Sequence, residues 1–140
     1  MSILIIIISS LWVGLIIGVS FIATPVKFKA KTLKLYSAVD VGRHTFLMFN
    51  KVELIVFIAM IIVMFLGTAL AFLYMLTLVL FAILIAQKFW LLPELVVRAE
   101  AVINGNPKPK SIHHISYAIF ELMKLLILLF MIIKTSNLLI

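Results

Sequence analysis

Cysteine is absent from this sequence, and charged residues are scarce. The lack of thiols excludes disulfide bonds, thiolate metal sites and cysteine nucleophiles. Charged residues make up 12% of the 140 residues and hydrophobic residues 66%, whereas a soluble domain is about a quarter charged and about half apolar. A chain of this length has too little volume to bury so much apolar surface, so lipid must serve as its solvent. The composition therefore predicts an integral membrane protein.

Alternation of apolar and polar residues, which a transmembrane β-barrel requires, is also missing. The runs 52–67 and 76–86 show no such alternation. Every backbone N–H and C=O needs an internal partner in hydrocarbon, so helices are the remaining solution. The predicted fold class is all-α, an integral membrane four-helix bundle that forms one domain over residues 1–140.

Four apolar segments are long enough to cross a membrane. Residues 3–24 carry no charge, and at 1.5 Å per residue about 20 residues span a hydrocarbon core of about 30 Å. Pro25 is expected to end this first helix, and Pro93 to end or kink the third, because proline lacks the N–H donor that a helix interior requires. We expect helices over about residues 3–24, 45–67, 70–92 and 112–134, with loops over residues 25–44 and 93–111.

The basic residues set the expected orientation. Nine of the twelve lie within 25–44 or 88–111, two stretches that helix counting places on the same side. Positive charge favours the cytoplasmic side, so both termini are expected on the non-cytoplasmic side of a multi-pass protein of the cell inner (plasma) membrane. The net charge of +7 then reflects orientation and contact with the lipid bilayer. No nucleic-acid binding is expected, because no basic helix stands free of the apolar segments.

Several aromatic and glycine landmarks follow one another along the segments. They are Leu11-Trp12-Val13-Gly14, Phe21, Phe28, Phe89-Trp90-Leu91-Leu92-Pro93 and His114. Their order resembles the transmembrane protein 205-like family and its bacterial domain-of-unknown-function relatives, over nearly the whole chain. The resemblance implies a four-helix membrane domain but brings no reaction to assign to residues here. The loop between the third and fourth helices is much shorter than in the eukaryotic member of that family, so a function specific to that loop does not carry over.

The fourth segment carries a polar stripe. At 100° per residue its ionisable side chains and one tyrosine fall within an arc of about 100°, and the opposite face is apolar. These residues are His113, His114, Tyr117, Glu121 and Lys124. Ionisable groups are costly against lipid, so the stripe is expected to face the bundle interior. It is either a structural Glu121–Lys124 ion pair with interfacial histidines, or a proton relay or ligand site.

Two further helices offer matching polar faces. On the third, Gln87, Trp90, Glu94 and Arg98 fall within about 80° if the helix continues past Pro93, although an interfacial belt explains Trp90 and Arg98 as well. On the second, Asn50 and Glu53 share a face with Phe57, Met60 and Met64. We therefore predict one buried polar site near the cytoplasmic side, which serves as a ligand site or proton relay. Its residues are Asn50, Glu53, Gln87, Glu94, His114, Tyr117, Glu121 and Lys124.

Metal and haem chemistry are weaker alternatives. His44 with His113 or His114 would supply two axial ligands to haem b, and methionine sulfur beside imidazole would suit copper(I). A methionine stripe is more often simple packing. No zinc-type histidine pair, Ser-His-Asp order, phosphate-binding glycine loop or dinucleotide fingerprint occurs, so an enzyme is not favoured.

Three functional classes follow. The preferred one is a small transport or ligand-binding bundle, and the alternatives are a haem- or quinone-binding redox protein and a structural or assembly subunit of a larger membrane complex. A single bundle of this size has little room for a pore. We therefore expect a homo-oligomer or a subunit of a complex, with the small residues Ser10, Gly14 and Gly18 as one face where helices approach closely.

Overall fold

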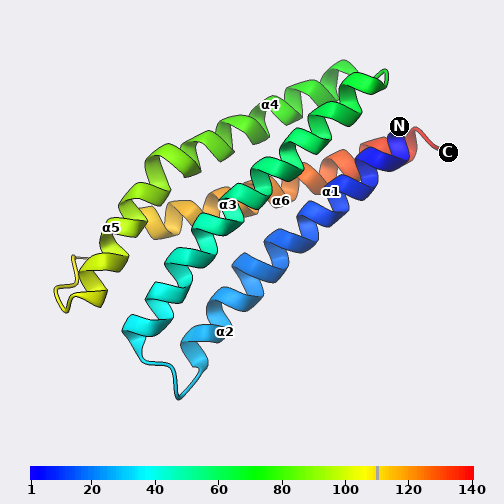
Figure 1. Cartoon of the computed structure of the whole chain (residues 1–140). Coiled ribbons are helices and arrows are strands. Elements are labelled where there is room, and N and C mark those ends of the chain that lie inside the picture. The colour runs from blue at the N-terminus through cyan, green and yellow to red at the C-terminus, as the bar shows by residue number, and fades with distance from the viewer. Residues whose placement is uncertain (110) are drawn as a thin grey trace.

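The chain folds into four long rods that run up and down beside one another, as the computed structural model of residues 1–109 and 111–140 shows (Figure 1). The first rod is Ser2–Lys29, which comprises α1 (Ser2–Ile16), a π-helical stretch (Ile17–Ala23) and α2 (Thr24–Lys29). The second is α3 (Leu35–Leu66). The third is Ala71–Ile103, which comprises α4 (Ala71–Ala86), a second π-helical stretch (Gln87–Leu91) and α5 (Leu92–Ile103). The fourth is α6 (His113–Asn137).

All four rods are long and apolar enough to cross a membrane. Large apolar side chains cover the outside, including Phe65 at 74% exposure, Ile55 at 67% and Met75 at 65%. Such a surface suits lipid and not water. The chain is an all-α, multi-pass membrane protein, and the predicted fold class is confirmed.

The helices are longer than predicted, and most of the two expected loops is helical. The expected loop 25–44 shrinks to residues 30–34, because α2 continues to Lys29 and α3 begins at Leu35. In the expected loop 93–111, residues 93–103 are helical, residues 104–109 and 111 lie outside helices, and residue 110 lies outside the described residues. At 1.5 Å per residue, the 32 residues of α3 are about 48 Å long, which is more than a hydrocarbon core of about 30 Å requires.

Pro25 does not end its helix as expected, and Pro93, which was expected to end or kink its helix, does not end it. Each lies in the first turn of a new α-helical stretch, where its missing N–H costs nothing. Each also follows directly on a π-helical stretch, in which the hydrogen bonds have already left the i to i−4 pattern. The π-helical turns therefore let both rods pass a proline without breaking.

The two ends of the bundle differ. Both termini and the turn between α3 and α4 lie at one end, here called the terminal end (Figure 1). The opposite end, here called the basic end, holds the connecting residues 30–34, 104–109 and 111–112. The main core runs along the bundle axis and includes Trp12, Met60, Leu84 and Leu128. A smaller core of Leu91, Leu92 and Tyr117 lies toward the basic end.

Candidate functional site

Three ionisable side chains meet inside the bundle and form what we call the buried triad: Glu53, Glu121 and Lys124. The Lys124 ammonium lies 2.5 Å from Glu53 Oε1 and 2.6 Å from Glu121 Oε1. The side chains of Glu53 and Lys124 are 0% exposed and that of Glu121 is 1% exposed. The three residues lie on α3 and α6, inside segments that span the membrane. One cation is therefore shared by two carboxylates away from solvent.

Neutral side chains from the other two rods donate further hydrogen bonds to the carboxylates. Trp12 Nε1 donates to Glu53 Oε1 at 2.9 Å. Gln87 Nε2 donates to Glu121 Oε1 at 2.7 Å, and Ser20 Oγ donates to Glu121 Oε2 at 2.8 Å. Each of the four rods thus contributes at least one polar side chain. Hydrogen bonds to ionised groups are stronger than neutral ones, so this network ties the rods together.

The two carboxylates differ in how well they are satisfied. Both oxygens of Glu121 accept hydrogen bonds, from Ser20, Gln87 and Lys124. Glu53 is satisfied only at Oε1, and its Oε2 has no hydrogen-bond partner among the described residues. Buried polar atoms are normally hydrogen-bonded, so the second oxygen of Glu53 can accept a further proton or hydrogen bond. Glu121 thus accepts hydrogen bonds at both oxygens, whereas Glu53 Oε2 remains an unused acceptor.

Other buried polar atoms near this level also lack partners within the described part of the chain. They are Gln87 Oε1, Asn50 Nδ2 and the Tyr117 hydroxyl. Asn50 precedes Glu53 by three residues on α3, and Tyr117 precedes Glu121 by four on α6, so both stand one turn closer to the basic end. The triad therefore continues as a polar track toward that end.

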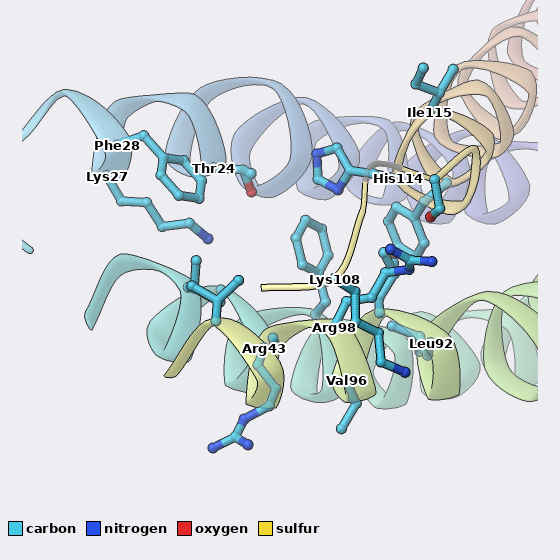
Figure 2. A pocket seen from close by; sticks show the side chains of 18 of the residues that line it. Thr24, Lys27, Phe28, Arg43, Leu92, Val96, Arg98, Lys108, His114 and Ile115 are labelled. Carbon is cyan, nitrogen blue, oxygen red and sulfur yellow. The ribbon is translucent and has the colours of Figure 1, made fainter. Parts of the chain in front are cut away.

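A cavity of about 490 Å³ opens where this track ends, between α2, α3, α5 and the start of α6 (Figure 2). Tyr117, one helical turn before Glu121 on α6, lines it, whereas no residue of the triad does. Its walls are largely apolar, with Phe28, Phe46 and Leu92 among them. The basic side chains that line it are Lys27, Arg43, Arg98, Lys108 and His114, and no aspartate or glutamate of the described chain does so. The cavity is therefore apolar and cationic.

The structure brings together some of the predicted site residues but not all. Glu53, Gln87, Glu121 and Lys124 are in direct contact. Asn50 and Tyr117 are buried one turn away, at 3% and 4% exposure.

Glu94 and His114 do not join this cluster. Glu94 Oε1 accepts a hydrogen bond from Arg98 on its own helix at 3.0 Å. His114 lines the cavity instead of the triad. Both residues lie toward the basic end, beyond the level of Tyr117, and the continuous third rod carries Glu94 past the triad.

The ligands required for haem or copper are not assembled. The His44 side chain is 70% exposed and approaches Asp40 of its own helix at 3.4 Å, and it does not line the cavity that His114 lines. His113 Nδ1 lies 3.0 Å from Ser111 Oγ, and its ring packs against Trp90. Met60 and Met64 are buried among apolar side chains of the main core. The histidines thus lie at the basic end, away from the thioethers that a copper(I) site would need beside them.

Trp12 and Ser20 belong to the site although sequence reasoning assigned neither to it. Trp12 had a detectable signal, because an indole N–H inside an otherwise apolar helix needs an acceptor from another helix. Ser20 had none. In an unbroken α-helix it would lie about 80° from Trp12, and the wider π-helical turn that begins at Ile17 rotates it back toward Glu121.

No family model matches this chain, and neither a curated protein nor a solved structure matches it.

Proposed function

We propose that this protein is a small transport or ligand-binding bundle in which the buried triad is the polar site and Glu53 is its proton-accepting group. The observation that carries the proposal is the charge imbalance of the triad. Two carboxylates share one ammonium at 2.5 and 2.6 Å, all at most 1% exposed. With all three ionised, the site carries one uncompensated negative charge in a low-dielectric interior, which is costly.

Binding one proton removes that imbalance. Glu121 is held as the counter-ion by three donors, whereas Glu53 Oε2 has no partner. A proton on Glu53 leaves Lys124 and Glu121 as a neutral pair. Ionisable groups inside membrane helices commonly serve such relays or ligand sites. Tyr117 and the cavity supply the route by which the proton, or a ligand coupled to it, reaches the site from the basic end.

The basic end is the cytoplasmic end in this proposal, and the membrane is the cell inner (plasma) membrane. The support is the concentration of lysine and arginine around residues 30–34 and 104–112 of the sequence. At the terminal end the core is closed around Met64 and Leu73, with a pocket of only about 40 Å³. The triad lines neither this pocket nor the cavity at the basic end, so transport would require conformations that open it to each end in turn.

Infrared difference spectroscopy after a pH change tests proton binding directly. We expect a protonated-carboxyl band in the wild type that disappears in Glu53→Gln and persists in Glu100→Gln, a control at an exposed acid. Proteoliposomes with a trapped pH dye then test whether proton uptake accompanies flux. A band unchanged in Glu53→Gln would refute the assignment of Glu53 as the proton acceptor. A folded wild type without any titrating carboxyl would show that the triad only stabilises the bundle.

A role as a subunit of a larger assembly is the second candidate. The ideal Cβ positions of Gly14 and Gly18 meet no atom within 4 Å, so this face of α1 is open to another helix. Small residues allow such close approach between helices in membranes. Native gels in mild detergent would detect the partner, whether a second copy or another chain.

A further inference from the structure

The cavity at the basic end has the chemistry of a binding site in its own right. Its volume of about 490 Å³ lies in the range of small-molecule sites, and its wall is mainly apolar. Its lining holds four cationic side chains and, within the described residues, no acidic one. This positive lining favours an anionic ligand over a cationic one.

The two arginines of the lining already have partners. Arg43 contacts Asp40 at 2.6 Å and Glu100 at 3.4 Å. Arg98 contacts Glu94 at 3.0 Å and also donates to the carbonyl of Pro109 at 2.5 Å. None of these acids lines the cavity, so they hold the arginines from outside it.

The two lysines of the lining are in a different position. Neither Lys27 nor Lys108 forms an ion pair with any residue that the structure describes. The Lys27 ammonium lies 5.5 Å from the ring centres of both Phe28 and Phe46, which fix it over the cavity by cation–π contact. Figure 2 shows its amino group directed from α2 toward the other lining residues. Lys27 is thus a positioned cation without a counter-ion.

Gly42 provides the space for that amino group. A Cβ atom at this position would lie 2.7 Å from Lys27 Nζ and 3.3 Å from Lys27 Cε, and it would meet no other atom within 4 Å. The end of the Lys27 side chain therefore lies against α3 at Gly42, because glycine has no Cβ and leaves room for it. This close approach orients the ammonium at the edge of the apolar wall.

We propose that the cavity binds an amphiphile that carries one phosphate or carboxylate group, with this group at Lys27 and the apolar part against Phe28, Phe46 and Leu92. This inference names the class of ligand for the proposed function. It rests on the proposed function for the role of that ligand. Two sources share this chemistry: an anionic lipid of the surrounding leaflet, whose headgroups lie at the depth where lysines reach the interface, and an amphiphile that arrives from water.

Dodecyl phosphate, added to the full-length protein in dodecyl maltoside, is the probe. We expect one bound molecule per chain in native mass spectra. Lys27→Gln should weaken binding about tenfold to a hundredfold, as loss of a hydrogen bond to a charged group predicts. Lys88→Gln is the matched control, since this lysine also lies over an aromatic ring, 5.4 Å from the centre of Phe89, but does not line the cavity.

Gly42→Ala keeps the test decisive if Lys27→Gln fails to fold. The new methyl group displaces only the end of Lys27, so it should weaken binding without unfolding the protein. Equal loss in Lys27→Gln and Lys88→Gln would overturn the proposal in favour of general surface attraction. Equal affinity for inorganic phosphate and dodecyl phosphate would also overturn it, because the apolar wall would then contribute nothing.

Nanodiscs separate the two sources of ligand. If the protein is extracted from nanodiscs that contain both lipids and retains phosphatidylglycerol but not phosphatidylcholine, the ligand is a lipid of the membrane. Dodecyl phosphate binding without lipid retention would support an amphiphile from water, and the absence of both would refute the site. Because binding is measured at equilibrium, it can fail while the Glu53 carboxyl still titrates, so failure of this inference is distinguishable from failure of the proposed function.

Discussion

Replacing Lys124 by methionine would leave two carboxylates in the bundle interior without their shared cation. Methionine matches the length of the lysine stem, so the variant removes charge and hydrogen bonds with little loss of volume. The ammonium is 0% exposed and contacts Glu53 at 2.5 Å and Glu121 at 2.6 Å. Removal of one partner from a buried ion pair costs about 3–5 kcal/mol, and here two partners lose it together.

The free energy of unfolding, measured by titration of sodium dodecyl sulfate into mixed micelles, is the readout. We expect Lys124→Met to lose about 3–5 kcal/mol. The control Lys134→Met, at an exposed lysine near the terminal end, should change stability by no more than about 0.5 kcal/mol.

A compensated variant isolates the electrostatic contribution. The triple variant Glu53→Gln, Glu121→Gln, Lys124→Met contains no buried charge, so it should recover most of the loss, because replacement of a whole ion network by neutral groups is often nearly neutral. A single variant as stable as Lys134→Met would refute the existence of the triad. A triple variant as unstable as the single one would show that side-chain packing, and not charge, accounts for the loss.

Three further predictions concern other parts of the bundle. Trp12→Phe removes the donor to Glu53 Oε1 while keeping a large ring, so it should cost about 1–3 kcal/mol in the same titration, and a neutral result would contradict the hydrogen bond. Gly14→Leu should leave monomer stability unchanged, because its Cβ meets nothing within 4 Å, but should abolish any dimer seen by light scattering. If the Gly14→Leu monomer unfolds at a lower temperature than the wild-type monomer, this face of α1 packs against other helices of the same chain. With no native cysteine in the chain, an impermeant thiol reagent on intact cells should label Ile140→Cys but not Lys31→Cys, and the reverse pattern would invert the topology.

Much of the candidate site could be anticipated because helical periodicity is local. The 100° spacing put Tyr117, Glu121 and Lys124 on one face of a single helix, and all three are buried there. The same rule failed for Glu94, which was grouped with Gln87 on one face of a helix. A π-helical stretch and Pro93 lie between the two residues, and Glu94 pairs with Arg98 beyond the level of the triad.

Composition and the lengths of the apolar segments by themselves determined that the chain is an all-α membrane protein with four helices, because lipid imposes both the length of an apolar segment and internal backbone hydrogen bonding. Tertiary structure alone decided which polar groups meet. The partners of Glu53, namely Trp12 and Lys124, are 41 and 71 residues away in sequence, and no local pattern encodes such distances. Ser20 reaches Glu121 only because a π-helical turn changes the rotation of its helix, and the cationic cavity exists only because α2, α3, α5 and α6 converge at one end. Helix existence depends on solvation of each segment, whereas a site depends on how four segments are rotated against one another.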